Sequence, residues 1–396
     1  MKKFSLAAIQ KVLSETRLDG WLFFDFMGSD PVGSSILQMD VKPDTSRRWM
    51  YFIPARGAPV KLVHALESSI LDHLPGKKEV YIGWKEMQQN LKSMFKTNAR
   101  IAVQYSPFNA IPMLSRIDAG MFELLKSFKL NLVTSGDLVQ QFDATLSKTQ
   151  LNTHLNTAAE LQKISDTTVR FIERRIKNHQ EVTELRVQSF VETQLKKFGL
   201  VSSMPQIIAS GSHSGNPRYF PTVKSDAPVR KKNLLQLSLR ARAKDEEAVY
   251  ASLSRVVYIG REVPETYTKN FQLLIKARSK ALRVIDQAMK ENKILPGWRV
   301  DDAARQVLRG EGLESYYLHR TGHSLGSQFY GHGVNLDNFE TRDERQIIPD
   351  LCFTMSPGIY FSDYGMRCEI NFYVDKEGAH LSTPLVQEDI HQIITT

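Results

Sequence analysis

The first part of the chain alternates segments in which apolar residues recur at helical spacing with short apolar runs. Residues 4–16 carry the helical spacing. Short apolar runs that predict strands lie at 20–24, 49–53, 60–63, 100–103 and 130–133. This alternation predicts an α/β domain. The segment contains no glycine-rich phosphate-binding loop and no cluster of acid/base residues, so the chemistry is expected further along the chain.

The period of the hydrophobic pattern changes at about residue 146. From there to residue 175 the apolar positions follow a helical repeat, which places a domain boundary between residues 1–148 and residues 149–396. Further helices are predicted at 182–198, 268–291 and 300–310, and a pair of strands at 234–240 and 248–259. The second domain is therefore expected to be α+β, with antiparallel strands.

Composition is that of an ordinary globular protein. The chain has 396 residues, of which 42% are hydrophobic and 24% charged, enough for two domains with separate cores. Cys352 and Cys368 lie in apolar runs and are expected to be buried, reduced thiols. Gln10 and Lys11 interrupt the first apolar run, and no apolar run approaches the ~18 residues of a membrane span. We therefore expect a cytoplasmic protein without a membrane segment.

The formal net charge is +9 and the isoelectric point is about 9.3. Basic residues cluster at 174–177 and 229–232, but these clusters are short and contain no interleaved aromatic residues. This pattern favours a solvated basic surface over a nucleic-acid site.

Six motifs in the second half occur in a fixed order. They are ASGSHSGNPRYFPT (209–222), the strand pair LLQLSL and AVYASLSRVVYIG, HRTGHSLG (319–326), HGVNLD (332–337), SPGIY (356–360) and RCEINFYV (367–374). Together they resemble the catalytic half of the Xaa-Pro peptidases. This is the pita-bread family, peptidase family M24, which includes aminopeptidase P, prolidase, methionine aminopeptidase and creatinase. The resemblance implies a creatinase-type α/β N-terminal domain, a pita-bread α+β C-terminal domain and a homodimer.

The resemblance also implies a metal site, and the chain departs from it. Active members hold two divalent ions (manganese, cobalt or zinc) with two aspartates, one histidine and two glutamates. The matching positions here are Ser238, Ser252, His323, Ser356 and Glu369. Serine hydroxyls are neutral and are poor ligands for these ions. No metal cofactor is therefore expected.

The acid/base positions of the family are replaced as well. Arg218 and Tyr330 stand where the family has histidines. An arginine stays protonated and cannot shuttle a proton at neutral pH. The pocket for a ligand is expected to include Arg218, Tyr219, His319, Arg320 and Arg367, where guanidinium groups would favour an anionic group. His319 could equally be a satisfied polar group at the end of a strand.

These departures predict a degenerate Xaa-Pro peptidase homologue that binds a peptide or amino-acid-like ligand and does not hydrolyse it by the two-metal route. Three alternatives remain open: an active metallopeptidase with an atypical site, a metal-free creatinase-like enzyme, and a protein or RNA interaction module. A fourth reading combines a serine with His323 and Glu369 as the parts of a nucleophilic site. Against it, the sequence shows no recognisable oxyanion hole.

Overall fold

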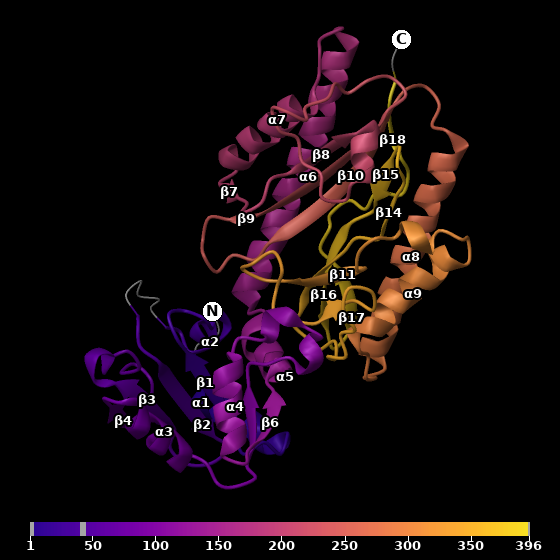
Figure 1. Ribbon diagram of the computed structural model, residues 1–396. Helices are drawn as coiled ribbons and strands as arrows, with labels where there is room; N and C mark the ends of the chain where they lie inside the picture. Colours follow the sequence, from indigo (N-terminus) through magenta and orange to yellow (C-terminus); the bar gives the residue numbers. More distant parts are fainter. Residues whose placement is uncertain (1–3, 40–44, 395–396) are drawn as a thin grey trace. The chain divides into compact units, whose positions relative to one another are not determined.

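The structure is a computed structural model that describes residues 4–39 and 45–394 (Figure 1). The chain forms two compact units that divide between Asp143 and Ala144. The sequence pattern placed this boundary slightly later, at 148/149. No helix among the described residues is long and apolar enough to cross a membrane.

The N-terminal unit is built on one six-stranded sheet in the order β4-β3-β2-β1-β5-β6. Strand β2 runs antiparallel to its neighbours β1 and β3, and the other adjacent strands pair in parallel. Its strands are β1 (Gly20–Asp25), β2 (Trp49–Pro54), β3 (Val60–His64), β4 (Lys77–Tyr81), β5 (Arg100–Val103) and β6 (Asn131–Thr134). Its main helices are α1 (Leu6–Glu15), α2 (Pro31–Ile36), α3 (Trp84–Ser93), α4 (Ala119–Ser127) and α5 (Gly136–Val139). The predicted α/β class is confirmed for this unit.

Strand β1 shows why this unit folds around its sheet. Its side chains alternate between two cores: Trp21 and Phe23 pack on one face, and Leu22 and Phe24 on the other. All six residues of β1 are buried, as expected for a central strand covered on both faces. The continuous apolar run in the sequence reflects this double burial.

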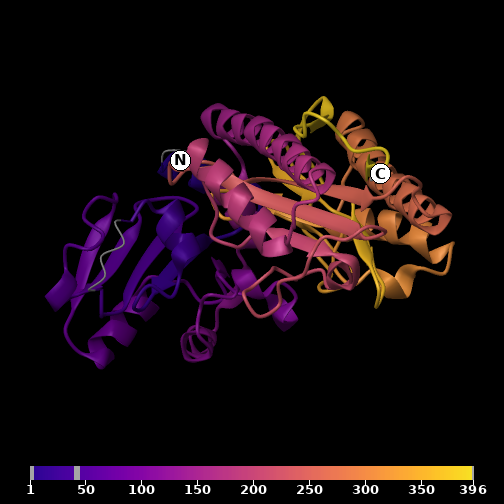
Figure 2. The same cartoon turned by 90° about the horizontal axis from the view of Figure 1, so that it is seen from above.

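The second unit starts with a long helix and a sheet built around one long hairpin. Strands β9 (Leu234–Ala243) and β10 (Ala251–Ile259) pair antiparallel, with β7 (Leu200–Val201), β8 (Ile207–Ser210) and β18 (His391–Ile393) alongside them. Helices α6 (Lys148–Lys177) and α7 (Glu184–Lys197) lie over this sheet (Figure 2). Their apolar faces and the inner residues of β9 and β10 form one core. A capping box of Ser147 and Gln150 starts α6.

A second sheet in this unit has the order β12-β11-β13-β16-β17. Its strands are β11 (Gly322–Leu325), β12 (Asn335–Leu336), β13 (Cys352–Met355), β16 (Ile370–Asp375) and β17 (Gly378–Leu381). Helices α8 (Glu265–Lys290) and α9 (Gly297–Arg309) pack against it and against each other, and a short hairpin is formed by β14 (Gly358–Tyr360) and β15 (Gly365–Arg367). The predicted α+β class with antiparallel strands is confirmed for this unit.

Candidate functional site

A carboxylate held by two hydroxyl groups forms the centre of the candidate site. The Ser252 hydroxyl on β10 donates to Glu369 Oε1 at 2.6 Å, and the Thr354 hydroxyl on β13 donates to the same oxygen at 2.8 Å. Asn371 on β16 fixes Ser252 from the other side, because its Oδ1 accepts from Ser252 N at 2.7 Å and its Nδ2 donates to Ser252 Oγ at 3.2 Å. Three strands from two sheets therefore meet at one glutamate.

The backbone of Glu369 is held by a further serine. The N–H of Glu369 donates to Ser254 Oγ at 2.8 Å, and the Ser254 hydroxyl donates to the carbonyl of Arg367 at 2.9 Å. Ser254 lies two residues after Ser252 on β10, so both side chains lie on the same face of the strand. The retained carboxylate is thus fixed through its side chain and through its main chain.

The residue directly opposite Ser252 in the β9–β10 hairpin is Arg240. Directly opposed residues share a face of the sheet, with Cα atoms about 5 Å apart. The Arg240 guanidinium lies over the Phe329 ring at 5.1 Å and forms no ion pair with a carboxylate among the described residues. Burial lowers the pKa of Arg240, and the nearby Arg367 and Arg218 lower it further, although Glu369 opposes this shift.

Ser238, the position expected for the first aspartate, lies elsewhere on β9. It is opposite Ser254, and its hydroxyl accepts from Gln236 Nε2 at 3.2 Å. No hydrogen bond within the described residues joins Ser238 to Ser252 or to Glu369. A ligand that shares an ion with position 252 would be better placed at position 240.

His323 lies on β11 with one ring nitrogen engaged. Its Nδ1 lies 2.9 Å from the carbonyl of Ser324, which makes Nδ1–H the donor and leaves the lone pair of the neutral ring on Nε2. Burial lowers its pKa to about 4, so the ring is neutral at pH 7. Phe329 and Tyr330 lie against the ring, with centroids 4.9 and 4.7 Å away.

A second histidine belongs to a directed chain of hydrogen bonds. Arg367 Nε donates to the Tyr360 hydroxyl at 3.0 Å, and Tyr360 lies 2.7 Å from His319 Nε2. His319 Nδ1 lies 2.8 Å from the carbonyl of Arg320. Burial and, to a smaller extent, the positive charge of Arg367 lower the pKa of His319 to about 3, so the neutral ring accepts at Nε2 and donates at Nδ1. His319 is therefore a satisfied polar group that lies beside Arg367 through Tyr360, and its place in a ligand pocket stays a prediction.

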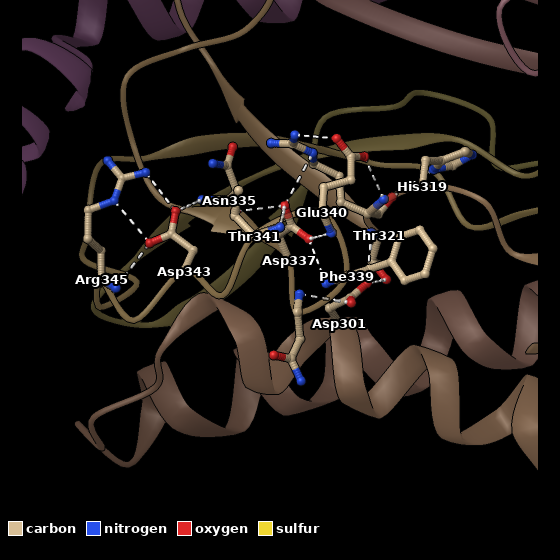
Figure 3. Close-up of polar contacts among 12 residues, drawn as sticks. Asp301, His319, Thr321, Asn335, Asp337, Phe339, Glu340, Thr341, Asp343 and Arg345 are labelled. Carbon is tan, nitrogen blue, oxygen red and sulfur yellow. Dashed lines mark hydrogen bonds and ion pairs between the residues drawn. The ribbon is translucent and has the colours of Figure 1, made fainter. Parts of the chain in front are cut away.

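The segment that carries both histidines is anchored by buried acids (Figure 3). Asp301 on α9 accepts from the N–H and hydroxyl of Thr321 and pairs with Arg305 at 2.7 Å. Asp337 accepts from backbone N–H groups of the turn that follows it, and Asp343 pairs with Arg345 at 2.7 Å. These acids have internal partners and serve to position the segment.

Among the described residues, none of the other predicted positions forms a hydrogen bond with Glu369. Ser356 lies just after β13, and its N–H donates to the carbonyl of Thr321 at 2.8 Å. The Arg320 guanidinium pairs with Glu340 at 2.6 Å. Arg218 is exposed. The Tyr219 hydroxyl donates to the buried carboxylate of Glu184 at 2.5 Å, and this bond and the stacking on His213 hold Tyr219 against the start of α7.

The family's pair of divalent ions does not fit the donors that are present. Among the described residues no group of three or more histidine, cysteine, aspartate or glutamate side chains converges as a metal site would require. Glu369 Oε1 is already occupied by two hydroxyl donors, and Arg240 brings a positive charge to the same face as Ser252. Adjacent divalent ions need anionic ligands to offset their repulsion.

Sequence reasoning missed four residues of the site: Arg240, Ser254, Thr354 and Asn371. Two of them left a signal, since Thr354 and Asn371 are polar residues inside apolar strand runs. A buried polar side chain in such a run needs a partner. Arg240 could not be placed without the register of the hairpin.

Comparison with known proteins gives a consistent result. A model of metallopeptidase family M24 matches residues 157–376. A Xaa-Pro dipeptidase of Lactobacillus delbrueckii subsp. lactis is 24% identical over 200 residues, which span 50% of this chain and 50% of that protein. The chain thus spans about half the length of this curated relative.

Solved structures extend the similarity to the whole chain. The dipeptidase PepE from Mycobacterium ulcerans superposes with a TM-score of 0.71 at 19% identity, covering 98% of this chain and 96% of that one. The prolidase from Pyrococcus horikoshii OT3 gives 0.65 at 18%, covering 97% and 99%. The predicted fold, a creatinase-type domain followed by a pita-bread domain, is confirmed by these neighbours.

Proposed function

The chain belongs to metallopeptidase family M24, and we propose that it is a member that binds an amino-acid-like or peptide-like ligand without hydrolysing it. The observation that carries the proposal is a pair of opposite charges on one face of the site. Glu369 and Arg240 both lie at Ser252, yet no ion pair joins them among the described residues. Each charge is therefore available to a ligand.

A zwitterion matches this arrangement. Glu369 Oε1 is used internally, while Oε2 has no hydrogen-bond partner within the described part of the chain and can accept from an ammonium group. The Arg240 guanidinium offers a planar pair of donors to a carboxylate. A partly buried cation with a depressed pKa gains more from an anionic partner than an exposed one does. The ligand class is thus an α-amino acid or a short peptide.

The absence of hydrolysis follows from the same residues. Family members activate water between two ions, and the donors here do not fit such a pair. Arg218 cannot take a proton, and Tyr330 is a weak base at neutral pH. The Ser252 hydroxyl is directed to Glu369 and not to a histidine, which also argues against a serine nucleophile.

Calorimetric titration with free amino acids and Xaa-Pro dipeptides tests the binding. We expect a zwitterionic ligand to bind and Arg240→Gln to weaken it by about tenfold or more, the scale of a lost hydrogen bond to a charged group. Arg261→Gln, which changes an exposed arginine of the same unit, is the control and should have no effect. Equal binding to the two variants would contradict the proposal.

A hydrolysis assay tests the other half of the proposal. Xaa-Pro dipeptides are incubated with the purified chain and added manganese, cobalt or zinc, and free proline is measured. We expect no turnover above a blank. Turnover that chelators abolish would overturn the proposal and support the atypical metallopeptidase. Chelator-resistant turnover would support a metal-free enzyme.

The proposal also covers the oligomeric state and the cellular location of the protein. Members of this family are often dimers, and we propose a cytoplasmic homodimer. Sedimentation velocity of the full chain and fractionation of the producing cells test these two statements. A monomer at micromolar concentration, or recovery outside the cytoplasm, would contradict them.

A further inference from the structure

A cavity of about 560 Å³ lies within the N-terminal unit, away from the residues discussed so far. Its aromatic and aliphatic wall consists of Phe24, Phe26, Tyr81, Ile82 and Trp84. Three of these side chains are unusually open for their size: Phe26 is 45% exposed, Ile82 74% and Trp84 59%. Large apolar side chains gathered around one hollow indicate a binding surface.

The position of the cavity in the fold also indicates a binding site. Strands β1, β3 and β4 belong to one sheet (Figure 1) and run in the same direction. Their carboxyl ends supply Phe24, His64 and Tyr81 to the wall. Open sheets with parallel strands bind small ligands in the crevice outside the carboxyl ends of the strands. The turn from β4 into α3 adds Ile82 and Trp84 at the same edge.

Two arginines bring positive charge to this cavity. Arg47 and Arg48 both line it, and no carboxylate pairs with either guanidinium among the described residues. The carboxylates at this cavity accept from other donors: Glu67 accepts from Ser46 and from the backbone N–H of Arg47, and Asp118, which also lines the cavity, accepts from the N–H of Met121 at the start of α4.

The His64 ring is a fixed, neutral part of the wall. Its Nδ1 accepts from Leu66 N at 3.1 Å, so Nε2 carries the hydrogen and donates to the carbonyl of Ile82 at 3.1 Å. The ring also lies edge-on to Tyr81, with centroids 5.1 Å apart. Both nitrogens are used, so the ring contributes shape and an aromatic face, and the positive charge comes from Arg47 and Arg48.

We propose that this cavity binds a small planar aromatic ligand that carries an anionic group, with the ring against Trp84 and Phe26 and the carboxylate or phosphate on Arg47 and Arg48. Aromatic side chains stack on planar rings, and guanidinium groups match the oxygens of carboxylates and phosphates. A second copy of the chain fits less well, because Arg47, Arg48 and Lys85 would face their own counterparts across a two-fold interface.

Calorimetry and tryptophan fluorescence of the full chain test this site with two pairs of probes. Indole-3-acetate and adenosine monophosphate carry the carboxylate and the phosphate, and indole-3-acetamide and adenosine are the neutral partners. We expect at least one anion to bind about tenfold or more tightly than its neutral partner, the scale of a hydrogen bond between charged groups. Which anion binds distinguishes a carboxylate from a phosphate ligand.

Substitutions in the cavity test whether the probes bind there. Arg48→Gln and Trp84→Ala should each weaken it by about tenfold or more, whereas Arg56→Gln, on an exposed turn of the same unit, should not change it. Arg240→Gln should also leave it unchanged, which separates this site from the one in the second unit. Equal affinity for charged and neutral probes, no binding at millimolar concentration, or binding that Trp84→Ala does not alter would each overturn the proposal. So would a dimer that Trp84→Ala dissociates while the probes have no effect, because the patch would then be a contact between copies.

Discussion

At the scale of single residues, Glu369 is held by two neutral hydroxyl groups, those of Ser252 and Thr354. Two hydroxyl groups satisfy Oε1, so the glutamate is held by hydrogen bonds that an amide oxygen could also accept. We therefore expect Glu369→Gln to change the free energy of unfolding by less than ~1 kcal/mol, because both hydroxyls keep an acceptor. Binding of an ammonium-bearing ligand should weaken at the same time. Urea unfolding together with calorimetry measures both, and a large loss of stability with unchanged binding would contradict the role given to Glu369.

The position of Arg240 can be tested by rebuilding a metal site. The variant Arg240→Asp, Ser252→Asp, Ser356→Glu places carboxylates around His323 and Glu369, and the matched control replaces Arg240→Asp with Ser238→Asp. Because position 240, and not 238, lies opposite Ser252, we expect the first variant to bind manganese about tenfold or more tightly. Titration followed by the electron paramagnetic resonance signal of manganese measures the difference in affinity between the two variants. Tighter binding by the control would show that the family's first ligand corresponds to position 238.

Three histidines with lowered pKa values predict a pH dependence of stability. Burial lowers the pKa of His154 and His323 to about 4 and that of His319 to about 3, from an ordinary value of 6.5. Below pH 6.5 the unfolded chain takes up protons that the folded chain does not, so stability is full above that pH and falls progressively down to about pH 4 for His154 and His323 and about pH 3 for His319. The loss at pH 5 should be on the order of 1–2 kcal/mol per histidine.

Urea unfolding at pH 7 and pH 5 measures this loss. His154→Gln should make the dependence shallower, because the glutamine amide does not titrate and would take the place of the ring beside Tyr250 and Ser382. His179→Asn, at an exposed residue with positive φ, should leave the dependence unchanged. Equal slopes for the wild type and His154→Gln would contradict the assignment.

At the scale of elements, helix α9 meets strand β12 at a glycine. A Cβ added to Gly297 would overlap the carbonyl oxygen of Asn335, which is backbone and cannot turn away. We expect Gly297→Ala to destabilise the second unit by about 1–3 kcal/mol, the range for overpacking. Gly310→Ala at the other end of α9 is the control, because a Cβ there meets only ordinary contacts and φ is −60°. Thermal unfolding compares the two variants. Equal midpoint temperatures would show that β12 can move to make room for the added methyl group.

The periodicity of the sequence identified the long helices and the long strands because their burial is regular. Helices α6, α7, α8 and α9 and strands β1, β9 and β10 lie within a few residues of the predicted spans. It missed α3 and α4, which are short and bury only one narrow face, including Met87 and Leu91 in α3. Short helices of this kind owe their stability to tertiary packing.

The site was harder to predict than the fold. Motif order located His323, Ser252 and Glu369. The structure brings them into one region, because His323 lies opposite Thr354, whose hydroxyl shares Glu369 with Ser252. It did not locate Arg240, because the β9–β10 hairpin sets which residues face each other and the sequence does not state the register. Long-range pairings such as Ser252 with Asn371 come from the meeting of two sheets, which no local pattern encodes.

At the scale of the whole molecule, the two compact units have separate cores. Residues up to Asp143 enclose two hydrophobic clusters around their own sheet. We expect a fragment of residues 1–143 to fold alone and to give a cooperative thermal transition. Dispersed amide resonances and circular dichroism test this, with residues 144–396 prepared in parallel. A fragment without cooperative unfolding would show that each core depends on the other unit.

The chain from Arg367 through Tyr360 and His319 to the carbonyl of Arg320 has one further consequence. Each donor in this series of hydrogen bonds points toward the carbonyl of Arg320, and each acceptor nitrogen or oxygen already receives a hydrogen. No free acceptor is left to which a proton could transfer. This hydrogen-bonded series therefore does not conduct protons, and its N–H and O–H hydrogens exchange slowly with water. In an NMR spectrum the ring N–H of His319 should persist as a slowly exchanging downfield resonance at neutral pH, whereas a working acid/base relay would exchange its protons with water.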